Sequence, residues 1–118
     1  MSPLIYKVLS DTEWHAATLC GEFTGSVVDK RDGYLHFSTE PQLFETVRKH
    51  FAGQTNLVLL SVRAEDLGAA VKWEPSRGGD LFPHLYGPLP VSAVISVSLL
   101  PLGPDGVHQF PNQLAGRE

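Results

Sequence analysis

The chain has 118 residues, of which 42% are hydrophobic and 19% charged, a composition typical of a single globular domain with its own core. A net charge of −4 without any long basic run argues against a nucleic-acid-binding protein, and no apolar run is long enough to span a membrane. The N-terminus lacks the pattern of a signal peptide, and the single Cys20 cannot form an internal disulfide, so we expect a cytoplasmic protein. We expect one domain over residues 1–118, with a core over 4–111 and a frayed tail over 112–118.

The N-terminal third contains a strand and a short helix. Residues 4–9 are apolar and predict the first strand. Ser10 and Glu13 have the spacing of a capping box, so we expect a helix to begin there and to end near Gly21. Residues 23–32 carry turn signals and no clear periodicity, which favours a loop or weak strand with the charged run 29–32 at its tip.

A second strand and the strongest helix follow. Residues 34–38 alternate as a short strand, and residues 40–52 place apolar side chains at helical spacing, with Gly53 expected after the helix end. Thr39 and Gln42 have capping-box spacing, although Ser38 is an equally good cap. If Thr39 is the cap, the hydroxyl of Ser38 is left to face a ligand.

The second half of the chain predicts mainly strands. Residues 57–62 are almost continuously apolar, which indicates a strand buried on both faces. Residues 71–74 and 81–86 alternate, and Pro83 argues against a central position for the second of these. Residues 92–99 alternate with the apolar side chains expected inside. The predicted class is α+β, with two short N-terminal helices packed on a mixed, mostly antiparallel sheet.

Two histidines are the main candidate site residues. On the 34–38 strand, Tyr34, His36 and Ser38 share one face, which suits a ligand site better than a core, although a lone strand histidine is often structural. His84 shares a face with Tyr86 and follows a glycine loop whose backbone N–H groups and arginine suit an anion. The further candidates on this second segment and its loop are Arg77, Gly78, Gly79 and Phe82.

Glu74 is the candidate carboxylate, and it leaves two interpretations open. It is either a solvated strand residue paired with Lys72 or Arg77, or a group that holds a ribose hydroxyl or acts as a base. A metal site made by His36, His84 and Glu74 is a third interpretation, but the sequence has no tight ligand spacing such as His-x-His.

Two sequence blocks are similar to those of a bacterial and plant family, the domain of unknown function 952 family. The first block is Asp32-Gly33-Tyr34-Leu35-His36-Phe37-Ser38. The second combines Trp73-Glu74, Arg77-Gly78-Gly79 and Phe82-Pro83-His84-Leu85-Tyr86-Gly87, and the resemblance extends over residues 4–111.

The resemblance implies a fold similar to that of the ADP-ribosyltransferase superfamily, which binds NAD in a cleft between two small sheets. In that superfamily a strand histidine, followed two residues later by Ser or Thr, holds the NAD ribose, and His36 and Ser38 match this element. A downstream aromatic residue stacks on nicotinamide, a role open to Tyr86 or Phe82. A late-strand glutamate drives transfer, but residues 92–99 contain no acid, so Glu74 would have to act from another strand.

Three hypotheses of function follow. The first is an enzyme, ADP-ribosyltransferase-like, that acts on NAD or an ADP-ribose-like small molecule as its substrate, with Glu74 and His84 as the catalytic residues. The second is a non-catalytic module that binds the same ligand, and the third is a metal-dependent hydrolase. No resident cofactor, nucleic-acid partner or membrane partner is expected.

Overall fold

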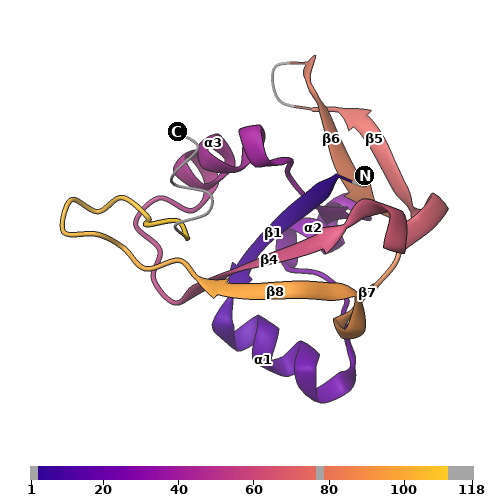
Figure 1. Ribbon diagram of the computed structural model, residues 1–118, viewed down its shortest axis with the longest axis horizontal. Helices are drawn as coiled ribbons and strands as arrows, with labels where there is room; N and C mark the ends of the chain where they lie inside the picture. The colour runs from indigo at the N-terminus through magenta and orange to yellow at the C-terminus, as the bar shows by residue number, and fades with distance from the viewer. Residues whose placement is uncertain (1–2, 77–78, 112–118) are drawn as a thin grey trace.

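The computed structural model describes residues 3–76 and 79–111 (Figure 1). In these residues the helices are α1 (Asp11–Cys20), α2 (Val27–Asp32) and α3 (Glu40–His50), with 3-10 segments at Ala64–Ala70 and Val91–Ala93. The strands are β1 (Leu4–Ser10), β2 (Glu22–Phe23), β3 (Leu35–His36), β4 (Leu57–Arg63), β5 (Val71–Pro75), β6 (Leu81–Leu85), β7 (Leu89–Pro90) and β8 (Val94–Leu99). The predicted tail over 112–118 and the loop residues Arg77 and Gly78 lie outside the described residues.

The strands form three small sheets, with the orders β1-β4-β8, β2-β7 and β3-β6-β5. Every strand pair in the described part of the chain is antiparallel. The α+β class is therefore confirmed, whereas the expectation of one mixed sheet is wrong. Alternation within a segment predicts a strand but does not specify its partner, so the division into three sheets could not be read from it.

The β1-β4-β8 sheet carries a core on each face, with α1 against one face and α3 against the other (Figure 1). The core on the α1 side contains Ile5, Leu9, Ala17, Phe23, Leu35, Phe37, Val58, Leu60, Val62, Leu85 and Leu89. The core on the α3 side contains Tyr6, Val8, Leu43, Val47, Leu57, Leu59 and Leu100. The predicted burial of residues 57–62 on both faces is confirmed, since all six are buried in the central strand β4.

Local capping signals fix the two longer helices. Ser10 caps α1, and its side chain accepts from the Glu13 N–H while the Glu13 carboxylate accepts from the Ser10 N–H. Gly21 ends α1 with a positive φ of 97°, as predicted. Thr39 caps α3, so the choice between Ser38 and Thr39 is settled, and α3 ends at His50 before reaching the predicted Gly53.

Among the described residues, no helix has the length and apolarity needed to cross a bilayer.

The prediction that Pro83 keeps its segment out of a sheet centre is wrong, because β6 lies between β3 and β5. The Pro83 carbonyl accepts from the Phe37 N–H at 3.0 Å, just past the end of β3. The N and C=O of one strand residue point to the same neighbour, so the missing N–H of Pro83 also faces the side where the β3 pairing stops. The central strand therefore loses little hydrogen bonding at this proline.

The exposure of the apolar side chains of β8 also differs from the prediction. Ile95, Val97 and Leu99 are 43%, 46% and 73% exposed, although the alternation predicted them inside. The register with β4 shifts between Ser61 and Val62, and β8 is an edge strand. Val97 and Leu99 lie opposite Leu60 and Val58 on the core face, so they are exposed because β8 is at the edge of the sheet, and a single sequence does not reveal that position.

Candidate functional site

The strand register brings the two candidate histidines together. His36 on β3 pairs directly with His84 on β6, and His84 pairs on its other side with Lys72 on β5. Residues opposite each other in antiparallel strands share a face of the sheet, and so do alternate residues of one strand. Glu74 is two residues after Lys72, the partner of His84, so it lies on the same face as the two histidines. The ring centroids of the two imidazoles are 5.6 Å apart, although His84 is buried.

Two tyrosines complete what we call the aromatic–imidazole cluster, which consists of Tyr34, His36, His84 and Tyr86. The Tyr34 ring stacks on His84, with centroids 4.1 Å apart and an interplanar angle of 26°. It also lies 4.7 Å from the His36 ring and 5.2 Å from the Tyr86 ring. Tyr34 therefore touches every other ring of the cluster, and it covers the buried His84.

Glu74 is hydrogen-bonded to two members of the cluster. His84 Nδ1 and the Tyr86 hydroxyl both donate to Glu74 Oε1, each at 2.8 Å. Since an ionised carboxylate only accepts, His84 Nδ1 carries the proton of this hydrogen bond. The bonds from His84 and Tyr86 lower the pKa of Glu74, and the bond to Glu74 raises the pKa of Tyr86. The carboxylate thus orients His84 while staying partly exposed.

A buried ion pair lies behind His36. The ammonium of Lys7, from β1, contacts Asp29 Oδ2 at 3.0 Å and donates to the carbonyl of His36 at 2.9 Å. Asp29 Oδ1 accepts from the backbone N–H of His36 at 3.0 Å and from its ring Nδ1 at 2.7 Å. The backbone N–H of Ser26 donates to Asp29 Oδ2 at 2.9 Å. Asp29 therefore fixes the orientation of the His36 ring through its buried nitrogen, Nδ1.

The protonation of this pair reflects its burial. Burial lowers the pKa of Lys7, and the charge and hydrogen bond of Asp29 oppose this only in part. Burial raises the pKa of Asp29, but the His36 ring, the Lys7 charge and two backbone N–H groups lower it by more, so the pKa lies well below its usual value. Asp29 is thus a carboxylate at every ordinary pH.

Residues 27–32 form α2, so the prediction of a loop with a charged tip at 29–32 is wrong. Asp29 is only 3% exposed, because the helix turns it toward Lys7. A sequence signal for this helix exists: Ser26 and Asp29 have the spacing of an N-terminal cap, and Gly33 ends the helix with a φ of 89°. At Gly25 a Cβ atom would lie 3.0 Å from that of Asp29, so this tight approach needs glycine.

Three other predicted site residues, Ser38, Phe82 and Gly79, are not members of the cluster. Ser38 is buried, its hydroxyl is bonded to Thr46 at 3.0 Å, and its backbone pairs with Tyr6 on β1. Phe82 is 6% exposed. Gly79 has a φ of 83°, and its N–H donates to the Ser76 carbonyl in the β5–β6 turn. Arg77 and Gly78, predicted to bind an anion, lie outside the described residues.

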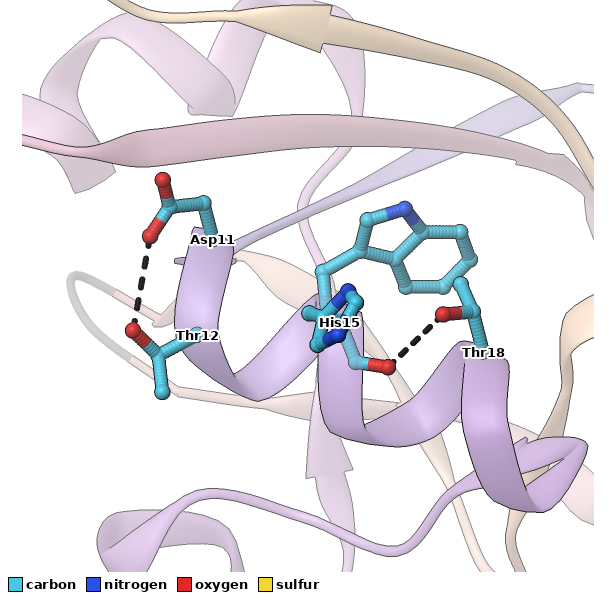
Figure 2. Close-up of a pocket in the computed structure, with 5 residues that line it drawn as sticks. Asp11, Thr12, His15 and Thr18 are labelled. Atoms are coloured by element: carbon cyan, nitrogen blue, oxygen red, sulfur yellow. Dashed lines mark hydrogen bonds between the residues drawn. The ribbon is translucent and has the colours of Figure 1, made fainter.

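Hollows open on the surface of the described residues both beside the cluster and along α1. One, of about 370 Å³, adjoins the cluster through Tyr34 and is lined by Thr24, Asp29, Lys30, Gly33, Tyr34, Leu35, Leu85, Gly87 and Pro88. The other, of about 530 Å³, lies along α1, which contributes no side chain to the cluster (Figure 2). There the Thr18 hydroxyl donates to the His15 carbonyl of the same helix at 2.7 Å, so this polar group is already satisfied.

The metal interpretation finds no preformed site in the part of the chain that the structure describes. No group of three or more His, Cys, Asp or Glu side chains is arranged there to hold an ion. Both ring nitrogens of His36 contact carboxylates of α2, whereas Glu74 contacts only His84 of the two histidines. His36, His84 and Glu74 therefore do not converge on one point.

These features define an α+β protein of three small antiparallel sheets with an aromatic–imidazole cluster on the β3-β6-β5 sheet. The chain belongs to the DUF952 family of proteins of unknown function, whose model matches residues 8–97. The X-ray structure of CC0527 from Caulobacter crescentus is similar, with 55% identity, a TM-score of 0.90, and coverage of 95% of this chain and 98% of that one. The solution NMR structure of CC0527 has a TM-score of 0.84 over 95% and 97% of the two chains. No curated protein matches.

Proposed function

We propose that the aromatic–imidazole cluster binds a small ligand that combines a flat ring with an anionic group, of the NAD or ADP-ribose class. The observation that carries this proposal is the meeting of Tyr34, His36, His84 and Tyr86 on one sheet face. Tyr86 is 40% exposed and Tyr34 lines the adjoining hollow, so both rings can stack on a base. The Lys72 ammonium, 5.1 Å from the Tyr86 ring centroid, supplies positive charge beside them.

The chemistry of the cluster also suits transfer of a ribosyl group, and an ADP-ribosyltransferase-like activity is part of the proposal. Breaking a glycosidic bond generates positive charge on the sugar, which a nearby carboxylate stabilises. Glu74 is a partly exposed carboxylate with a lowered pKa, oriented by His84 and Tyr86. In this scheme Glu74 faces the sugar from β5 and replaces the acid that β8 lacks, while His84 holds Glu74 in position.

Replacing Glu74 by glutamine separates catalysis from binding. The amide keeps the size of the side chain but loses the charge, so we expect nicotinamide release from NAD to fall by about 100-fold or more, with NAD affinity changed by less than about threefold. Release is measured chromatographically and affinity by calorimetry. Glu45→Gln, on the exposed side of α3, removes the same charge and is expected to change neither quantity.

The possible outcomes distinguish the hypotheses. NAD or ADP-ribose binding without any nicotinamide release by the wild-type protein would identify a non-catalytic binding module. Absence of binding to either compound would contradict the proposed ligand class. Release that is equal in the wild-type protein and in Glu74→Gln would rule out the assigned role of Glu74.

A further inference from the structure

The carboxylate of Asp32, in the last turn of α2, bridges the side chains of His36 and Arg31 at the edge of the cluster. Its Oδ2 accepts from His36 Nε2 at 2.9 Å, and its Oδ1 accepts from Arg31 Nε at 3.0 Å. The Arg31 side chain is 69% exposed and that of Asp32 is 29% exposed. Asp32 therefore occupies an accessible position between an imidazole and a guanidinium.

The two carboxylates on His36 differ in how firmly they are held. Asp29 is buried and bonded to Lys7 and to backbone N–H groups, so it is a fixed part of the fold. Asp32 is bonded to the exposed Arg31, and exposed ion pairs of this kind contribute little to stability. The fold therefore needs Asp29 for its own integrity but gains little from the contact of Asp32 with His36.

The charges of this group favour an incoming anion. Asp32 accepts from the Arg31 guanidinium and lies 2.9 Å from His36 Nε2, so two nitrogen groups converge on this one carboxylate. Lys7 pairs with Asp29 and Arg31 pairs with Asp32, so an anion that replaced the Asp32 carboxylate would keep Arg31 paired. If Asp32 turns away, the exposed donors of His36 and Arg31 are left without their anion and present a site for a phosphate oxygen.

We propose that an anionic oxygen of the ligand takes the place of the Asp32 carboxylate between His36 and Arg31, and that Asp32 is a built-in competitor for this position. This inference rests on the proposed function and assigns the phosphate subsite within it. A base stacked on Tyr34, whose ring is 4.7 Å from that of His36, would have its attached phosphate within reach of the same donors. The diphosphate of a nucleotide and free inorganic pyrophosphate share the required chemistry.

Calorimetric titration of Asp32→Asn with three probes tests the proposal. Removing the competing charge is expected to tighten binding of ADP-ribose by about tenfold, and of pyrophosphate too if the subsite accepts it without a base, because like-charge repulsion disappears. Adenosine, which carries no phosphate, should bind the variant and the wild-type protein equally. Asp66→Asn removes the same charge from an exposed position in the 3-10 segment and should leave all three affinities unchanged.

Arg31→Gln provides the reciprocal test, since this exposed side chain can be changed without disturbing the core. It should weaken ADP-ribose binding by about tenfold, because one charged donor is lost. Binding of ADP-ribose to wild-type protein with no gain in Asp32→Asn and no loss in Arg31→Gln would overturn this inference and leave the proposed function standing. Binding by Asp32→Asn alone would support the inference, and no binding by any form would overturn both.

Discussion

Replacing Asp29 by asparagine is expected to lower the free energy of unfolding by about 3–5 kcal/mol, because it leaves the buried ammonium of Lys7 without its counter-charge. Lys7 is 5% exposed and Asp29 is 3% exposed, so water cannot replace the lost carboxylate. Urea unfolding followed by tryptophan fluorescence at neutral pH measures the loss. A change below about 1 kcal/mol, within the range of ordinary hydrogen bonds, would contradict the assignment of a buried charged pair.

Two further variants control this experiment. Asp66→Asn removes an exposed carboxylate and should change stability by less than about 0.5 kcal/mol. The double variant Lys7→Met with Asp29→Asn removes both charges and keeps an amide oxygen that can accept from the backbone N–H groups, so it should recover most of the stability that Asp29→Asn alone loses. Equal losses in the single and double variants would mean that packing, and not the unpaired charge, explains the effect.

The pH dependence of this effect has a definite sign. The pKa of Asp29 is lower in the folded protein than in the unfolded chain, where it is about 3.9. The stabilisation is therefore complete above the unfolded pKa and is lost as the pH falls toward the lower folded pKa. The stability difference between the wild-type protein and Asp29→Asn should narrow as the pH is lowered below about 4.

Replacing His36 by alanine is expected to preserve the fold and to weaken ADP-ribose binding by at least about tenfold. The ring lies at the rim of the cluster, and its side chain is 33% exposed. Without it, Asp29 still accepts from Lys7 and from two backbone N–H groups, so we expect a stability loss of only about 1–2 kcal/mol. Calorimetry gives the affinity, and circular dichroism at increasing temperature gives the stability.

His15→Ala is the matched control for this prediction. His15 lies on the hollow along α1, away from the cluster, so its loss should leave ADP-ribose binding unchanged (Figure 2). Unfolding of His36→Ala would show that His36 is a structural residue. Weaker binding in His15→Ala together with unchanged binding in His36→Ala would move the ligand site to α1.

Elements fixed by neighbouring residues could be predicted from the sequence. The capping pairs at the starts of α1 and α3 act over three residues, and both helices begin as predicted. The buried strand β4 was evident from its continuous apolar run. The rings of Tyr34 and His36 lie together as predicted, although β3 is only Leu35–His36, and the predicted third member of that face, Ser38, is buried.

Features fixed by distant residues could not be predicted. Asp29 is buried because it meets Lys7, which is 22 positions earlier in the chain, and no local pattern indicates such a partner. The pairing of His36 with His84 depends on the β3–β6 register, which joins residues 48 positions apart and which no local pattern specifies. Pro83 is tolerated in a central strand because β3 ends beside it.

Titration of ADP-ribose into isotopically labelled wild-type protein, followed by NMR, tests the ligand site most directly. We expect saturable chemical-shift changes that are largest for the side chains of Tyr34, His36, His84 and Tyr86 and that extend to Asp32. No change at millimolar ligand, or changes confined to α1, would contradict the assignment of this cluster as the binding site.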